Sequence, residues 1–234
     1  MRRLAARRAV RTKRGVMSTL QLWGQYLPQF LAGLVVSLQL TGAALVLALA
    51  LGTLLVLART GRIRVLAAIA TGYVEVFRAV PVLVLLFTAY YSLAQMGLRL
   101  PGFWAGVVAL GAFYGALYGE DMRSGLQSVD PGQREAAVAL GLSNGTVMRR
   151  VVLPQAFLAF LPPGTNELSN LIKDTSLVLT IGVTDLMFQA NAAAAATFQP
   201  MDMFLLAGLV YFAFYILLSR ILARWELNVQ RRRS

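Results

Sequence analysis

The chain has 234 residues, of which 58% are apolar and only 14% are charged, whereas about 25% of residues are charged in a typical soluble domain. Such a composition cannot cover a water-soluble surface, and without Cys or His the chain also lacks thiol nucleophiles, disulfides, structural zinc and histidine-based catalytic triads. The net charge of +12 suits nucleic acid or the anionic face of a membrane, and the apolar content favours the membrane.

Five apolar segments supply candidates for membrane-spanning helices, each of which needs roughly 20 apolar residues. They cover residues 30–57, about 80–96, about 103–119, about 168–186 and 203–222. Residues 65–74 are interpreted as an interfacial or cytoplasmic-end helix, and Pro81 breaks the chain after it because proline lacks an amide donor. Residues 191–200, which include a run of alanines, are interpreted as an exposed connector. The sequence therefore predicts an all-α membrane protein with five transmembrane helices.

Glycines spaced by four residues mark the third of these segments. Gly111, Gly115 and Gly119 fall on one face of a helix, where they permit a neighbouring backbone to approach closely. We interpret this pattern as helix packing.

The basic residues orient the predicted spans, because Lys and Arg are enriched in cytoplasmic loops. One side carries 12 arginines, within residues 59–64, 123–150 and 220–233, and the other carries Arg99 and 7 basic residues of the N-terminal tail. This bias predicts a cytoplasmic C-terminus and an external N-terminus. The tail opposes the assignment: it is either a basic arm at a surface or, as we favour, a segment that precedes a native start at Met17.

These features divide the chain into three parts. The first part is a basic tail, 1–17, which the favoured start at Met17 would exclude from the native protein. A second basic tail, 226–234, is predicted to be cytoplasmic. The transmembrane domain, 18–225, contains a polar cytoplasmic loop at about 120–165.

The catalytic motifs of the common enzyme classes are missing from this sequence. The only lysines are Lys13 and Lys173, and neither closes a phosphate-binding P-loop. No Gly-x-Ser-x-Gly nucleophile turn is present, and the carboxylates are scattered. The sequence therefore predicts no catalytic residue and no metal site.

A long motif in the polar loop decides among the remaining functions. Its Glu-Ala-Ala triplet is followed after three residues by a glycine and, nine residues later, by Val-Val-Leu-Pro. Residues 135–140 are expected to form a short helix that ends at a left-handed glycine, and its small side chains suit docking in a groove of a partner protein. The residues of the motif are Gly132, Glu135, Ala136, Ala137, Gly141, Leu153 and Pro154.

This motif resembles the EAA loop of the inner-membrane permeases of binding-protein-dependent ATP-binding cassette (ABC) importers. Further segments are similar to the polar amino acid permeases, the group for histidine, glutamate, glutamine, arginine and opines. These segments are residues 75–81, 123–129, 153–156, 161–163 and 173–177. The chain departs from that group at Gly119-Glu120-Asp121 and at Gly164-Thr165, and both departures bear on which substrate is carried.

The resemblance implies a type I ABC importer (MetI-like) permease fold for about residues 18–225. It implies a bacterial inner-membrane protein that moves polar amino acids and works with a cytoplasmic ABC ATPase dimer, a second permease subunit that is identical or paralogous, and an extracytoplasmic amino-acid-binding protein. ATP and Mg²⁺ would bind to the ATPase, so this chain would be no enzyme and would hold no cofactor; no nucleic-acid partner is expected. Glu135 and the loop arginines would contact the ATPase, and Ala136, Ala137 and Gly141 would allow its close approach.

Ionisable residues at membrane depth are costly and usually face a cavity or one another. One interpretation is a substrate path for a zwitterion, lined by Glu75, Asn166, Glu167, Asn170 and Asp174. The other is structural: Lys173 and Asp174 pair with neighbouring helices near Glu75 or Arg78. We assign a structural or gating role to Arg78, Pro81 and Lys173.

An ATP-independent secondary amino acid transporter or channel is the alternative function. That class predicts internal inverted repeats, and no convincing repeat relates residues 30–119 to residues 168–222. A membrane scaffold without transport would leave the loop motif unexplained.

Overall fold

The computed structural model describes the backbone of residues 2–231 and the side chains of residues 19–226 and Val229. Within these limits the chain is helical, with short connections and no strand. The helices are α1 (Arg2–Thr60), α2 (Arg64–Ala79), α3 (Val82–Phe87), the π-helical η1 (Thr88–Ser92), α4 (Leu93–Gln95), α5 (Gly102–Gln127), α6 (Pro131–Ala139), α7 (Asn144–Val147), the π-helical η2 (Met148–Val152), α8 (Leu153–Asp174), the 3₁₀-helical η3 (Thr175–Ile181), α9 (Leu186–Thr197) and α10 (Pro200–Arg231). The predicted all-α architecture is confirmed.

Three of the described helices are long and apolar enough to cross a membrane alone. They are Thr19–Thr60 of α1, Gly102–Gln127 and Pro200–Glu226. Two bent pairs pass the same test: α2 with α3–α4, at an angle of 106°, and the continuous α7–η3 stretch with α9, at 50°. Counting each bent pair as one span gives five spans, the predicted number.

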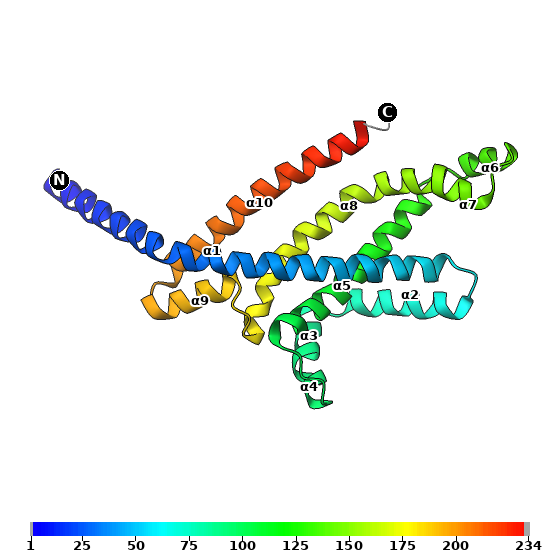
Figure 1. Cartoon of the computed structure of the whole chain (residues 1–234). Helices are drawn as coiled ribbons and strands as arrows, with labels where there is room; N and C mark the ends of the chain where they lie inside the picture. The colour runs from blue at the N-terminus through cyan, green and yellow to red at the C-terminus, as the bar shows by residue number, and fades with distance from the viewer. Residues whose placement is uncertain (1, 232–234) are drawn as a thin grey trace.

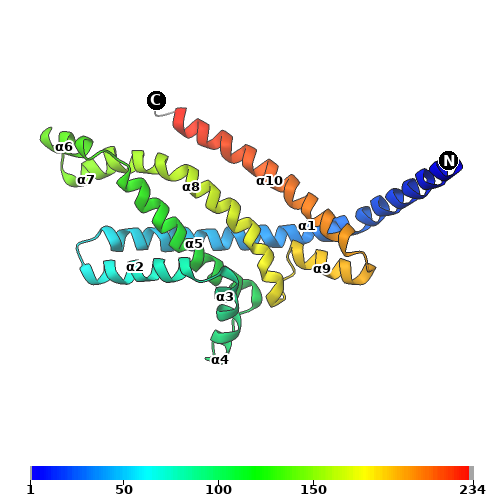
Figure 2. The same cartoon turned by 180° about the vertical axis from the view of Figure 1, so that it is seen from behind.

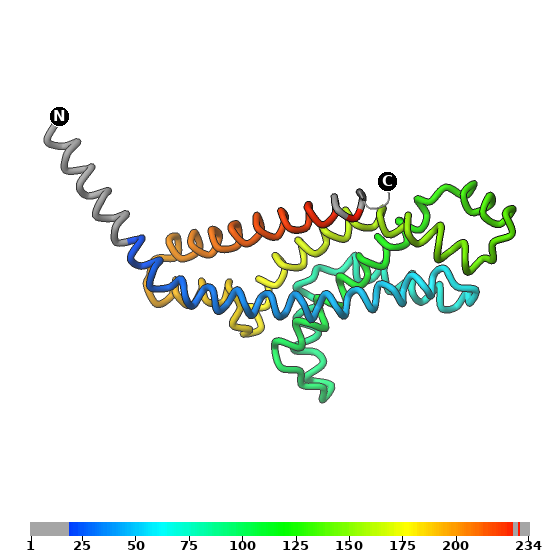
Figure 3. Tube along the Cα trace, turned by 45° about the horizontal axis from the view of Figure 1, so that its top comes forward, coloured from blue at the N-terminus to red at the C-terminus, as the bar shows by residue number. Residues whose placement is uncertain are grey.

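The helices are arranged around α1, which forms the long axis of the molecule. In Figures 1 and 2, α2 runs back beside the second half of α1, and α6 and α7 lie toward the end where these two helices meet. Helix α9 and the start of α10 lie toward the other end of the bundle. Figure 3 shows α10 leading from α9 back toward the end that carries α6. The loop motif and α9 are therefore separated by the length of the bundle.

The contact between α1 and α5 is the most extensive in the fold, and glycines make it close. A Cβ added to Gly115 would lie 2.9 Å from the Cβ of Leu51, and one added to Gly52 would lie 3.0 Å from the amide nitrogen of Gly119. Real Cβ atoms essentially never approach closer than 3.0 Å. The close approach predicted from the glycine spacing is thus confirmed, and both helices contribute a glycine to it.

The second predicted span differs from expectation in its shape. Val80 and Pro81 are extended, with ψ angles of 131° and 136°, so the break at Pro81 is confirmed. Residues 82–95 form α3, η1 and α4 without a gap, and this stretch lies at 106° to α2, so the bend falls at the break before it.

The run of alanines was predicted to be an exposed connector, and this prediction is wrong. Residues up to Thr197 belong to α9, and Ala190, Ala193 and Ala194 are buried in a cluster with Phe30 of α1 and Leu206 of α10. Alanine has the highest helix propensity of all residues, and its small side chain lets three helices meet closely. Only the last residues of the segment connect α9 to α10.

The predicted polar loop, about 120–165, includes the end of α5 and the start of α8. Helix α5 continues to Gln127 and α8 begins at Leu153, so the connection covers residues 128–152. Charged residues at 120–123 suggested that the helix ends there. In the structure these charges are paired inside the helical region, because Glu120 accepts a hydrogen bond from Arg59 at 2.6 Å and forms an ion pair with Arg123. Pro162 and Pro163, taken as loop residues, lie inside α8.

Candidate functional site

The loop motif folds into a short helix with a defined start and end. Helix α6 begins after Asp130, whose carboxylate accepts a hydrogen bond from the amide of Gly132 at 2.7 Å. It ends at Gly141, which has φ +84°, a left-handed conformation that glycine adopts without strain. The amide of Leu142 donates to the carbonyl of Ala137 at 3.2 Å, which completes a Schellman cap. The predicted helix and its left-handed glycine are confirmed.

One face of α6 packs inside the loop itself. Ala137 is only 7% exposed and forms a small core with Val147 and Val152, against Leu126 and Val129. We expected Ala137 to allow the approach of a partner, and this expectation is wrong, because η2 and the end of α5 already cover it. The alanine instead lets α6 lie close to its own chain.

The other face of α6 is uncovered and partly apolar. Glu135 and Ala136 are exposed, and so are Val138 at 47% and Leu140 at 83%. Residues three and four positions apart share a helix face, so Leu140 lies on the face of Ala136 and Val138 on the face of Glu135. Val138 and Leu140 themselves point to different sides of the helix. The sequence analysis missed these two apolar residues. A helical projection of residues 131–140 would have shown Val138 and Leu140 away from Ala137, which is the one buried residue of this stretch.

A polar hollow of about 560 Å³ lies beside α6 and is lined by Ser143, Gly145, Thr146, Arg149 and Arg150. Both arginines are exposed. Ser143 accepts a hydrogen bond from the amide of Thr146 and so caps α7. The loop therefore presents apolar side chains next to positive charge.

A second polar region lies in the seam between α5 and α8. The Tyr114 hydroxyl donates to Asp174 at 2.8 Å, and the Tyr118 hydroxyl donates to the carbonyl of Gly164 at 3.1 Å. Both tyrosines are almost fully buried. The predicted pairing of Asp174 with a residue near Glu75 or Arg78 is therefore wrong: its partner is a tyrosine of α5, which the sequence analysis assigned to no site.

Arg78, which is exposed, lies within electrostatic range of two carboxylates near this seam. Arg78 of α2 interacts electrostatically with Glu167 of α8 and with Asp121 of α5. One oxygen of Asp121 is buried and has no hydrogen-bond partner among the described residues. In the sequence, Asp121 was noted only as a departure from the related permeases. In the structure, its carboxylate interacts electrostatically with Arg78.

The predicted substrate-path residues are only partly brought together. Glu167 and Asp174 are half-buried in the seam, and Asn170 interacts with Glu167. Glu75, Asn166 and Lys173 are exposed, and neither ion pair found among the described residues includes Lys173.

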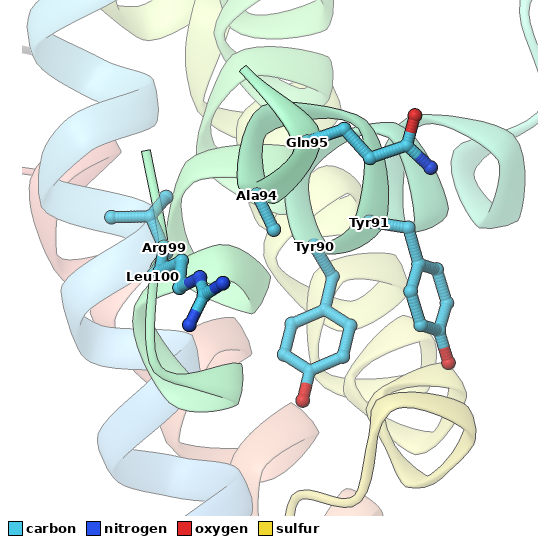
Figure 4. Close-up of a pocket in the computed structure, with 6 residues that line it drawn as sticks. All are labelled: Tyr90, Tyr91, Ala94, Gln95, Arg99 and Leu100. Atoms are coloured by element: carbon cyan, nitrogen blue, oxygen red, sulfur yellow. The ribbon is translucent and has the colours of Figure 1, made fainter. Parts of the chain in front are cut away.

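A cavity of about 470 Å³ lies between η1, α4 and the segment that leads into α5. Figure 4 shows Tyr90 and Tyr91 pointing the same way along its wall, with Arg99 and Leu100 beside Tyr90. The two tyrosine rings meet edge to face, with centroids 4.9 Å apart. This cavity and the α5–α8 seam share no lining residue.

The site contains no acidic or histidine cluster suited to a metal ion. Among the residues described, no group of three or more His, Cys, Asp or Glu side chains is placed to hold one.

Comparison with known proteins agrees with this fold and with the loop motif. Residues 48–233 match the family of binding-protein-dependent transport system inner membrane components. The chain is 37% identical to the arginine transport system permease protein of Bacillus subtilis, over 83% of this chain and 90% of that protein. It is 35% identical to the nopaline transport system permease protein of Agrobacterium fabrum, over 89% and 92% of the two chains. The glutamate/aspartate import permease protein of Escherichia coli is 34% identical, over 80% and 87%.

Solved structures lead to the same fold. A crystal structure of an amino acid ABC transporter with histidines contains a chain that superimposes with a TM-score of 0.83 at 35% identity, covering 87% of this chain and 95% of that one. A chain of an inward-facing methionine ABC transporter superimposes with a TM-score of 0.66 at 20% identity, over 90% and 97% of the two chains, which bears on the fold alone. The chain belongs to the binding-protein-dependent transport system inner membrane components, and it is a multi-pass membrane permease subunit of an ABC importer.

Proposed function

We propose that this permease carries polar amino acids through the seam between α5 and α8, and that α6 couples it to a cytoplasmic ABC ATPase. Relatives whose names specify a substrate carry arginine, nopaline or glutamate and aspartate, all polar amino acids or their derivatives, which supports the substrate class.

The exposed side chain of Leu140, at the end of α6, is the observation that carries the coupling role. A leucine that is 83% exposed at the tip of a polar loop gains free energy only when another surface covers it. The small Ala136 beside it permits close approach, and Glu135, Arg149 and Arg150 supply polar contacts around the apolar centre. This arrangement, an apolar anchor within a polar rim, is typical of protein interfaces.

The proposed substrate path is supported by the charge balance of the seam. Two carboxylates, Asp121 and Glu167, interact electrostatically with a single cation, Arg78, and a third, Asp174, interacts with Glu167. An excess of carboxylates stabilises the ammonium group of a zwitterion, and Arg78 can pair with its carboxylate. Glu75 and Asn166, on exposed faces of α2 and α8, belong to the proposed path as residues that a second permease subunit would cover.

The distribution of arginines supports an external N-terminus and a cytoplasmic C-terminus and α6 loop. In that orientation a dimeric ATPase meets α6, and an amino-acid-binding protein delivers substrate at the end of the bundle that carries α9. The second permease subunit is either a copy of this chain or a paralogue. ATP and Mg²⁺ bind to the ATPase and no cofactor binds to this chain, so ATP-driven closure of the ATPase moves α6 and, through α5 and α8, the walls of the path.

The experiment replaces Leu140 by glutamate in the assembled transporter. Because the Leu140 side chain packs against little of its own chain, Leu140→Glu should leave the yield of inserted permease unchanged. Copurification of the ATPase and uptake of amino acid should both fall at least tenfold, which corresponds to a loss of about 1.4 kcal/mol at the interface. Met201→Glu is the matched control: Met201 is also 83% exposed but lies at the far end of the bundle. ATPase binding by Leu140→Glu at the level of Met201→Glu would contradict the docking role.

A further inference from the structure

Two unpaired oxygens are buried where α1, η3, α9 and α10 meet, at the end of the bundle opposite to α6 (Figures 1 and 3). Asp185 is 0% exposed, and one of its carboxylate oxygens, Oδ2, has no hydrogen-bond partner among the described residues. The same holds for the hydroxyl of Tyr211 on α10. Native structures rarely bury such atoms without a partner, so each of them requires an explanation.

The other carboxylate oxygen of Asp185 is satisfied. Oδ1 accepts a hydrogen bond from the amide of Phe188 at 2.8 Å, which caps α9. Gly33 of α1 presses against the same turn, because a Cβ on it would lie 2.7 Å from the carbonyl oxygen of Asp185. The backbone around Asp185 is therefore held in place, and Oδ2 cannot reach water by a local shift of the chain.

The hydroxyls of Ser37 and Thr175 lie close enough to the Tyr211 oxygen to act on it, but no hydrogen bond with good geometry joins them to it. Ser37 donates its proton to the carbonyl of Gly33 at 3.2 Å, and Thr175 donates its proton to the carbonyl of Ile172 at 2.7 Å. Ser37 Oγ already accepts a hydrogen bond from the amide of Leu186 at 3.3 Å. Both hydroxyl protons are committed, so Ser37 and Thr175 can only accept further hydrogen bonds. The junction thus holds one free donor, the Tyr211 hydroxyl, beside three acceptors: Asp185 Oδ2, Ser37 Oγ and Thr175 Oγ1.

Asp185 and Tyr211 interact electrostatically without a direct hydrogen bond. Polar groups separated by more than a hydrogen bond are commonly bridged by water, and a buried water makes about three hydrogen bonds to otherwise unpaired groups. One water supplies two donors and also accepts, which matches the shortage of donors at the junction. The backbone amides of Phe188, Met187 and Asp185 itself act on the carboxylate of Asp185, and no charged side chain does, so no neighbouring cation satisfies Oδ2.

We propose that this junction is a binding site for one internal water, which accepts a hydrogen bond from Tyr211 and donates to Asp185 Oδ2 and to Ser37 or Thr175. The water links α10 to the start of α9 and to α1, so the three helices move as one unit. The site lies at the opposite end of the bundle from α6, and its existence does not depend on the proposed coupling role.

The test is a double-mutant cycle on the thermal unfolding of the assembled transporter. Tyr211→Phe removes one partner of the water, and Asp185→Ser keeps an oxygen that can cap α9 but removes Oδ2. Each single substitution should lower the apparent Tm by about 2–4 °C. The double variant should lose clearly less than the sum, because either substitution alone disrupts the same bridge. Tyr215→Phe, at an exposed position one turn along α10, is the matched control and should be additive with Asp185→Ser. Additivity of Tyr211→Phe with Asp185→Ser would overturn the proposal.

A structure of the wild-type transporter at a resolution that shows ordered waters provides a second readout, which needs no variant. Density within hydrogen-bond distance of both Asp185 Oδ2 and the Tyr211 hydroxyl is expected, and a direct contact between the two side chains would overturn the proposal. Replacing Na⁺ and K⁺ in the buffer by tetramethylammonium should leave the Tm unchanged. A Tm that depends on the small cation would assign the density to a metal ion and would also overturn it.

Discussion

Helix α5 packs against its neighbours through two faces of opposite chemistry. The face toward α1 is apolar, and Gly115 and Gly119 bring the two backbones together. The face toward α8 carries Tyr114 and Tyr118, whose hydroxyls are bonded to Asp174 and to the carbonyl of Gly164. The first seam is held by close apolar packing. The second combines these polar contacts with one close backbone approach, where a Cβ on Gly125 would lie 2.6 Å from the carbonyl oxygen of Ala156.

This contrast bears on which helices can move relative to one another during transport. Interlocked backbones lose many contacts at once when they slide, because packed interiors are bistable and not continuously deformable. A polar seam can exchange one hydrogen-bond partner for another, including a substrate. We infer that α1 and α5 move as one body and that transport changes the separation of α5 from α8.

The largest expected effect is at the apolar seam. Gly115→Leu places a side chain where even a Cβ lies 2.9 Å from Leu51, and overpacking of this kind costs about 1–3 kcal/mol or more. The yield of folded permease after detergent extraction should fall severalfold, and uptake should fall with it. Gly208→Leu on α10 is the matched control, because nothing lies within 4 Å of its Cβ position. A normal yield for Gly115→Leu would show that the seam is not rigid.

The polar seam should respond in the opposite way, with a loss of transport but not of folding. Glu167→Gln keeps the shape of the side chain and removes a charge that we place in the substrate path. Losing a hydrogen bond to a charged group costs about 1.5–3 kcal/mol, so amino acid uptake should fall about tenfold or more at an unchanged yield. Asp202→Asn, which removes a carboxylate at the start of α10, should leave uptake near the wild-type level. Equal uptake by the two variants would remove Glu167 from the path.

The sequence predicted those features that depend on neighbouring residues. The helix at residues 135–140 and its end at Gly141 follow from local backbone preferences, and the break at Pro81 follows from the missing amide. The sequence could not place Asp121 beside Arg78 and Glu167, because this contact joins three helices that are far apart in the chain. The alanines of α9 were misassigned for a related reason: alanine suits both an exposed turn and a close helix contact, and only the positions of α1 and α10 decide between them.

The smallest effect on stability is expected from the ion pairs at one end of the contact between α1 and α5. Glu120 of α5 accepts from Arg59 of α1 at 2.6 Å and pairs with Arg123, and the three side chains are 17–25% exposed. Solvent screens such pairs, and exposed ones contribute at most about 1 kcal/mol. Glu120→Gln should therefore lower the apparent Tm by no more than about 2–4 °C, with uptake unchanged, and the difference should shrink as salt is added. Glu226→Gln on α10 serves as the control, since Glu226 takes part in neither of the ion pairs found among the described residues. A loss of folding as large as that of Gly115→Leu would mean that charge, and not the glycine contact, holds α1 to α5.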